Sequence, residues 1–143
     1  MTEKQRNFVF YRRLNKLADF LETVPKERFR YDVWVGKDWK GKPDLSCGTR
    51  ACAAGWATTM PEFRRLGLRL EYTPGAEWQY VINIKSKEVY NKAVYALEPI
   101  FGPLSESVFV PVEDFEEKLT PKQVAKKIRR LIQADKDYNG YED

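Results

Sequence analysis

The fold is decided by residues 46–60, SCGTRACAAGWATTM, a stretch rich in small side chains. Between Ala51 and Ala57 it contains four alanines, one cysteine, one glycine and one tryptophan. Small side chains let neighbouring elements approach a helix closely, and alanine and free cysteine are often buried. Ser46 or Thr49 could cap the helix at its N-terminus. We therefore predict a short helix, ending at Met60, at the centre of the fold.

The residues before this segment predict a helix, an extended segment and a loop. Apolar residues follow a helical spacing within residues 7–23, at Phe10, Leu14, Leu17, Ala18 and Leu21. Residues 29–35 alternate between apolar and polar, which favours a short strand, although Trp34 would face the other way. Residues 36–44 are rich in glycine, proline and charge, which indicates an exposed loop.

The residues after the segment predict a hairpin between helices. Pro61 fits the start of a short helical turn through Arg65. Residues 67–85 then contain two β-rich runs around turn residues, as in a β-hairpin. A helix is expected from Ser86 to about Phe101, ended by Gly102 and Pro103, whereas residues 105–112 are ambiguous. Thr120 and Pro121 begin a last helix that we expect to end near Ala134.

Length and composition indicate one folded domain. The chain has 143 residues, of which 43% are hydrophobic and 32% charged, which is enough apolar surface for a core. We predict a compact α+β domain over residues 1–134, with about four helices around the small central one and a β-hairpin or small antiparallel sheet. The segment from Tyr31 to Val35 is a candidate third strand. Residues 135–143 are predicted to form an acidic, mobile C-terminal tail.

The residue counts exclude several classes of function. The chain has no histidine, which removes Ser-His-Asp and Cys-His catalysis and histidine-ligated zinc. Two cysteines are too few for a disulfide scaffold, and no apolar run is long enough to span a membrane. Residues 1–6 lack the apolar core expected of a signal peptide. We therefore expect a cytoplasmic protein without a cofactor or a membrane partner. The net charge of +4 is mild for a nucleic-acid binder.

Residues 47–57, CGTRACAAGWA, resemble a C-G-T-x-A-C-A-x-G-W-A pattern of small uncharacterised proteins from bacteriophages and bacterial genomes. The resemblance extends loosely to the helix end at Phe101-Gly102 and to the helix start at Thr120-Pro121. It implies a phage or bacterial origin, and it assigns no catalytic or binding residue.

The same motif permits three chemical interpretations beside a purely structural one. The first is an anion or nucleotide site formed by Gly48, Thr49 and Arg50, with Trp56 or Trp39 stacking on a base. The second is a cysteine nucleophile, which would lack a histidine base, and the third is a metal site, which two thiolates cannot complete. The structural interpretation, in which small residues fill a crowded helix crossing, carries most weight.

Two further surfaces are candidates for binding. The exposed-loop residue Trp39 could anchor a protein partner, with the basic side chains of Lys37, Lys40 and Lys42 beside it. The same lysines, together with the basic faces of the first and last helices, could bind nucleic acid. The acidic residues 113–117 oppose that interpretation because they repel phosphate.

The C-terminus resembles the start of a calcium-binding loop. Asp135, Asp137, Asn139 and Gly140 follow the D-x-D-x-N-G spacing of an EF-hand. The bidentate glutamate of that loop would fall beyond Asp143, so this is a weak calcium candidate.

These observations favour a non-enzymatic accessory protein of phage type. We expect it to bind a host protein as an inhibitor or adaptor, including against host defence. The alternatives are a module that sequesters a nucleotide or another small anion and, less favoured, a nucleic-acid-binding module.

Overall fold

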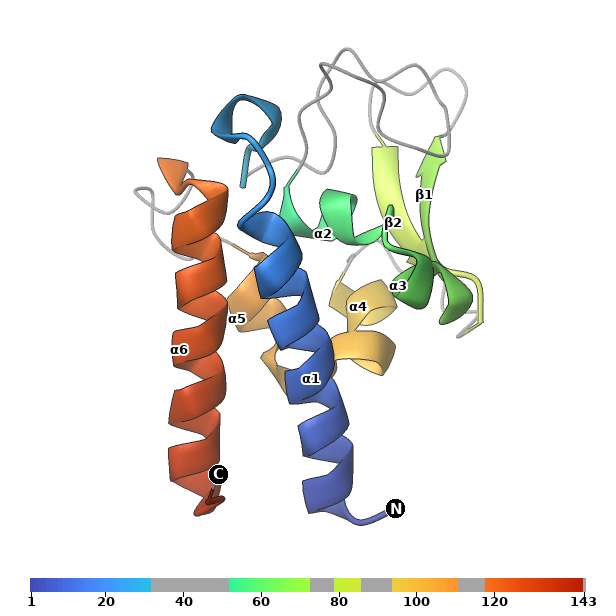
Figure 1. Cartoon of the computed structure of the whole chain (residues 1–143). Helices are drawn as coiled ribbons and strands as arrows, with labels where there is room; N and C mark the ends of the chain where they lie inside the picture. Colours follow the sequence, from blue (N-terminus) through green and yellow to red (C-terminus); the bar gives the residue numbers. More distant parts are fainter. Residues whose placement is uncertain (32–51, 73–78, 86–93, 111–117, 143) are drawn as a thin grey trace.

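The computed structural model describes residues 1–31, 52–72, 79–85, 94–110 and 118–142. Helices account for most of them (Figure 1). In chain order the elements are α1 (Glu3–Leu21), η1 (Lys26–Arg28), α2 (Ala53–Ala57), α3 (Pro61–Arg65), β1 (Leu68–Tyr72), β2 (Gln79–Asn83), α4 (Val94–Phe101), η2 (Gly102–Leu104), α5 (Ser105–Phe109) and α6 (Pro121–Asn139).

Both long helices begin at a threonine cap. Thr2 caps α1 and Thr120 caps α6, and in each case the threonine side chain accepts a hydrogen bond from the backbone of the third helical residue. The glutamine at that position, Gln5 or Gln123, bonds back to the backbone N–H of the cap. This reciprocal pair satisfies two backbone donors that a helix start would otherwise leave without partners. The predicted start of the last helix at Thr120 and Pro121 is confirmed.

The predicted end of the last helix is wrong, because α6 continues past Ala134 to Asn139. It stops at Gly140, which has a left-handed backbone with φ of 71°. The N–H of Gly140 donates to the carbonyl of Asp137, and the N–H of Tyr141 donates to the carbonyl of Lys136. These two bonds form a Schellman motif, which satisfies carbonyls at the helix end and turns the chain back toward α1.

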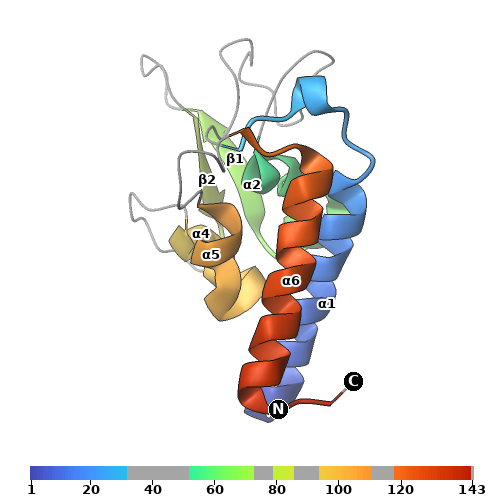
Figure 2. The same ribbon diagram turned by 90° about the vertical axis from the view of Figure 1, so that its left-hand side faces the viewer.

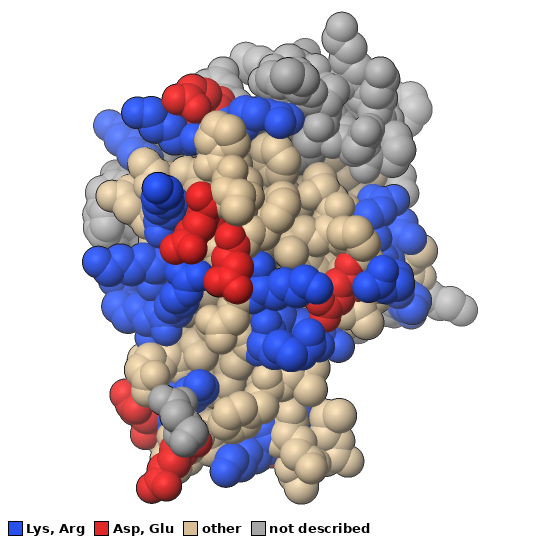
Figure 3. Space-filling view, in the orientation of Figure 1, with Lys and Arg blue, Asp and Glu red and all other residues tan. Residues whose placement is uncertain are grey.

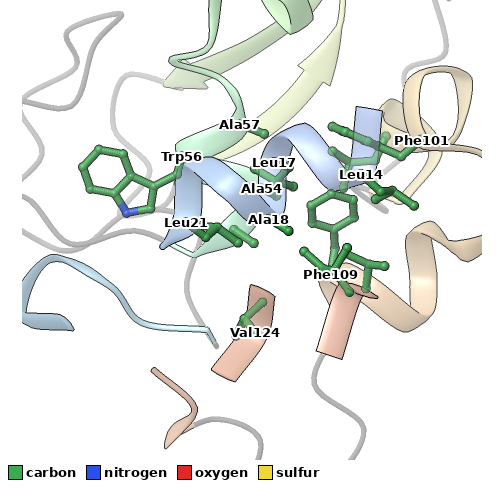
Figure 4. Packing of buried hydrophobic residues seen from close by; sticks show 14 of the residues in the cluster. Leu14, Leu17, Ala18, Leu21, Ala54, Trp56, Ala57, Phe101, Phe109 and Val124 are labelled. Atoms are coloured by element: carbon green, nitrogen blue, oxygen red, sulfur yellow. The ribbon is translucent and has the colours of Figure 1, made fainter. Parts of the chain in front are cut away.

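α1 and α6 lie side by side and antiparallel, so that both chain termini are at the same end of the pair (Figures 1 and 2). The remaining described elements pack against one side of this pair. The predicted apolar stripe of α1 is largely confirmed: Leu14, Leu17, Ala18 and Leu21 are all buried, and Tyr11 joins them. In Figure 4 Leu17 lies beside Ala54 of α2, whereas Leu14 lies beside Phe101 of α4.

The small helix α2 is completely buried, as its composition predicts. It is shorter than expected and begins at Ala53, after an N-cap formed by Cys52. The Cys52 sulfur accepts a hydrogen bond from the N–H of Gly55 at 3.5 Å. The expectation that Ser46 or Thr49 caps this helix is therefore wrong, and both residues lie outside the described part of the chain.

The predicted α+β class is wrong, because the protein is mainly helical. Within the described residues, β structure is limited to the antiparallel pair β1 and β2, in which Leu68 faces Asn83 and Tyr72 faces Gln79. The buried core comes chiefly from helices, with Leu68 and Leu70 as the buried side chains of β1. Of the proposed third strand from Tyr31 to Val35, only Tyr31 is described, and residues 32–35 lie outside the described part of the chain.

The middle of the chain returns to helix after the strands. Residues 86–93 lie outside the described part, so the predicted start at Ser86 is not described, whereas the end of α4 at Phe101 agrees with the prediction. Gly102 then takes a left-handed conformation with φ of 79°. A Cβ atom at this position would lie 2.3 Å from a ring carbon of Phe10, so only glycine fits between α4 and α1.

None of the helices described here is long and apolar enough to cross a membrane.

Candidate binding surface

Most of the residues singled out from the sequence lie outside the described part of the chain. These are Lys37, Trp39, Lys40, Lys42, Gly48, Thr49 and Arg50, together with Cys47. The described members are Cys52, Trp56 and the three C-terminal calcium candidates.

Trp56 is a core residue with 7% of its surface exposed. Its indole N–H donates to the carbonyl of Arg28 at 3.0 Å, and the Arg28 guanidinium lies 4.9 Å from the ring centre. Phe20 of α1 packs against the ring at 6.2 Å between centroids. Because these contacts already use the polar edge and a face of the indole, Trp56 ties α2 to η1 and α1 rather than stacking on a ligand base.

Cys52 also has a structural position. Its side chain is 1% exposed and caps α2. A nucleophilic thiol needs partial exposure and an electropositive environment, whereas a buried thiol behaves as a small apolar group. The described contacts of Cys52 therefore support the structural interpretation of the motif.

The calcium candidates Asp135, Asp137 and Asn139 lie on the last turns of α6, not in a loop. Asp135 accepts a hydrogen bond from the Tyr11 hydroxyl, and Asp137 accepts one from Gln133 at 3.0 Å. Residues two apart on a helix do not face one another, so these side chains do not converge on one ion. Among the described residues, no group of three or more metal-ligating side chains gathers at one place.

The most distinctive described surface is a basic face on the outer side of α1 and α6 (Figure 3). Lys122, Lys126 and Arg130 are exposed and recur every four residues, which places them on one side of α6. We call these three residues the α6 basic stripe. Their interactions include no ion pair with any other described residue, so within this part of the chain the charge of the stripe is not compensated.

Arg129, another cation of the basic face, is held by carboxylates. Arg129 of α6 pairs with Asp19 at 2.6 Å and with Glu22 at 2.9 Å, both on α1. These two hydrogen bonds raise the pKa of Arg129 and fix its guanidinium across the space between the helices. The pairs are partly exposed, so each contributes about 0–1 kcal/mol to stability and mainly sets the pattern of charge on the surface.

A second set of ion pairs joins α1 to α3. Glu62 accepts hydrogen bonds from Lys16 at 2.6 Å and from Arg12 at 3.0 Å. The bond from Lys16 is the main reason that the pKa of Glu62 is below its ordinary value. Two cations thus share one largely covered carboxylate, which leaves this edge of the face positive as well.

A shallow open groove of about 450 Å³ runs between the two sets of ion pairs. We call it the α1–α6 groove. Its lining comes almost entirely from α1, with Lys136 as the contribution of α6: Phe8, Tyr11, Arg12, Asn15, Lys16, Asp19 and Lys136. The groove therefore has aromatic rings at one end, a carboxylate at the other and cations on both sides.

Phe8 and Tyr11 form the aromatic end of the groove, and Tyr141 packs against Phe8. The Phe8 ring lies 5.6 Å from each of the other two rings. Asn7 donates to the Tyr141 hydroxyl at 3.0 Å, which holds the residue after the Gly140 turn against α1. Burial and the hydrogen bond to Asp135 raise the pKa of Tyr11, so its phenol stays protonated and acts as a donor.

One buried lysine was not indicated by the sequence. Lys127 is 6% exposed, and its ammonium donates to the Tyr31 hydroxyl at 2.9 Å. That hydroxyl donates in turn to the carbonyl of Val108 in α5. The helical pattern predicts that Lys122, Lys126, Arg129 and Arg130 face outward. Because position 127 holds a lysine rather than an apolar residue, the pattern did not indicate that this side of α6 is covered. The Tyr31–Lys127 pair links α6 to α5 and to the residues before the undescribed segment.

A second open groove, of about 390 Å³, lies near the start of α6. Phe29 and Leu119 are its apolar residues, and Lys26, Arg30 and Lys118 make it basic too. Positive charge thus extends beyond the α1–α6 face.

No family model, curated protein or solved structure matches this chain, so its function is argued from its own residues.

Proposed function

We propose that this chain is a non-enzymatic binding protein whose basic face docks onto an acidic surface of another protein. The observation that carries the proposal is the α6 basic stripe, three solvent-facing cations on one side of a helix, beside a groove with aromatic residues. Uncompensated charge on a rigid helix pair speeds association with a partner of opposite charge, and aromatic rings supply contact area.

The pattern of charge favours a protein over a nucleic acid as the partner. Asp19, Glu22 and Glu62 lie among the cations of the face, each within an ion pair. A continuous phosphate backbone would approach these carboxylates at close range, which costs free energy. A protein surface can instead present acidic side chains opposite the stripe and other groups opposite the carboxylates.

The phage-type role follows from the sequence resemblance and belongs to the same proposal. On this proposal the partner is a host protein, and the chain acts as its inhibitor or adaptor. Binding of a nucleotide through Gly48, Thr49, Arg50 and Trp56 has less support, because the indole of Trp56 is engaged inside the core.

Charge reversal on the stripe tests the proposal. The double variant Lys126→Glu, Arg130→Glu is compared with the double variant Arg65→Glu, Lys85→Glu, which changes net charge equally at exposed cations outside α1 and α6. Each tagged protein is used to capture partners from a nuclease-treated bacterial lysate. We expect a discrete protein that the unmodified chain and the control variant retain and the stripe variant loses. Equal retention by both variants would contradict the proposal. So would a partner that is captured from an untreated lysate but not from the nuclease-treated one.

A further inference from the structure

The α1–α6 groove combines two kinds of chemistry that a flat basic surface does not have. Its aromatic end presents the partly exposed ring of Phe8, packed edge-on against Tyr11. Its sides carry Arg12 and Lys16 on α1 and Lys136 on α6. A ligand that suits this groove is therefore apolar where it meets the ring and negatively charged beside Arg12, Lys16 and Lys136, but not beside Asp19 at the far end of the groove.

The lysines near the rings suit such a ligand. The Lys136 ammonium lies 5.5 Å from the centre of the Phe8 ring and 5.8 Å from that of Tyr11. The Lys4 ammonium lies 5.9 Å from Phe8 and 5.6 Å from Tyr141. Contacts of this type are weak at an exposed site, about 0.5–1 kcal/mol each. A carboxylate brought close by a partner can therefore bind the exposed Lys4 ammonium without disrupting the fold.

We propose that the α1–α6 groove binds an acidic peptide segment of the partner that places one aromatic or aliphatic side chain against Phe8. The inference rests on the proposed function and deepens it, because it names the chemistry of the bound segment. The groove volume of about 450 Å³ accommodates one large side chain with its neighbouring residues. The groove is lined by three cations and one carboxylate, Asp19, and this net positive charge selects acidic neighbours over neutral or basic ones.

Two synthetic peptides test the inference. The first is a short acidic peptide with a single central tryptophan, and the second is identical except for alanine in place of that tryptophan. Binding of both to the full chain is measured by fluorescence anisotropy. We expect the tryptophan peptide to bind about tenfold more tightly, since the anchor buries its ring against another ring.

Matched variants of α1 locate the effect. Phe8→Ala should remove the tenfold preference for the tryptophan peptide. Phe20→Ala, which alters another partly buried phenylalanine of the same helix, should leave the preference intact. Far-UV circular dichroism verifies that both variants fold. If Phe8→Ala does not fold, Phe8→Leu replaces it, because leucine removes the ring but keeps apolar volume. Amide shifts in the unmodified chain should concentrate at Phe8, Asn15 and Asp19.

The outcomes distinguish this inference from the proposed function. Equal binding of the two peptides, binding of neither, or an unchanged preference in Phe8→Ala would each overturn the inference. If the lysate partner is still lost upon Lys126→Glu, Arg130→Glu in that case, the proposed function stands without the groove. If the lysate partner is insensitive to those two substitutions, the proposed function itself fails.

Discussion

Gly102→Ala should destabilise the protein by about 2–5 kcal/mol. The backbone of Gly102 has φ of 79°, and an L-residue in this region costs about 1–2 kcal/mol. The new Cβ would also lie 2.3 Å from Cδ2 and 2.6 Å from Cγ of Phe10. Because Cγ is near the base of that side chain, a small rotation of the ring does not relieve the clash, and overpacking adds about 1–3 kcal/mol.

Gly140→Ala is the matched control for this substitution. Gly140 has φ of 71°, yet its Cβ would have no atom within 4 Å. It should therefore lose only the conformational component, about 1–2 kcal/mol. The difference between the two variants measures the contact between Gly102 and Phe10, which joins the end of α4 to α1.

Urea unfolding followed by tryptophan fluorescence gives both free energies of unfolding. When it is introduced into the Phe10→Ala variant, Gly102→Ala should cost only the conformational component, because the ring that meets the new Cβ has been removed. Equal losses in Gly102→Ala and Gly140→Ala would refute the close approach of Phe10 to Gly102. So would a double variant in which the two losses simply add.

Three further predictions concern the helix cap and the titrating groups. Thr120→Ala should cost about 0.5–2 kcal/mol in urea unfolding, because it removes the cap of α6, and an unchanged free energy would contradict that role. Burial and the bond to Asp135 raise the pKa of Tyr11 in the folded state, so its contribution to stability is present below its ordinary pKa of 10.0 and is lost as pH rises above it. Tyr11→Phe should abolish this loss of stability at alkaline pH. Identical stability–pH curves for the variant and the unmodified chain would count against the burial of the phenol and its bond to Asp135. Glu62 has a lowered pKa, so its contribution to stability is present above its ordinary pKa of 4.5 and is lost as pH falls below it. Glu62→Gln should therefore reduce the loss of stability at acid pH. An unchanged dependence of stability on acid pH would argue against the pairing with Lys16.

The helices were predictable where local signals agree. The apolar stripe of α1, the Thr120–Pro121 start of α6 and the short turn from Pro61 to Arg65 all follow from spacing and capping residues. The end of α6 was not predictable in this way, because residues 135–139 have no apolar stripe and match a calcium-loop pattern. What extends the helix is tertiary: Asp135 bonds to Tyr11 on α1, and the Gly140 turn places Tyr141 against Phe8.

The fold class was overestimated in its β content for a related reason. The pattern of residues 67–85 is strand-like, but a strand pair contributes little to the core when helices cover most of it. Composition could not reveal that balance. The share of helix and strand in the core depends on how α1, α2 and α6 pack together. The alternation of small and large side chains in these helices does not measure that share directly.

The candidate surface was predictable only in part. The outward position of Lys122, Lys126 and Arg130 follows from the helical period of α6. That Arg12 and Lys16 belong to the same face depends on the pairing of α1 with α6. The link from these two residues to Glu62 joins positions far apart in the sequence, and no local pattern carries it.

Site-specific photo-crosslinking tests the central claim, that the basic face of α1 and α6 is the docking surface, most directly. A photoreactive residue is placed at Lys126 in the stripe, or as a control at Ile84, which is 50% exposed. Ile84 directly follows β2, a strand that lies away from α6 in Figure 1. After illumination in a nuclease-treated bacterial lysate, we predict a discrete crosslinked protein from position 126 and none from position 84. Crosslinks of equal yield from both positions, or none from position 126, would contradict the claim.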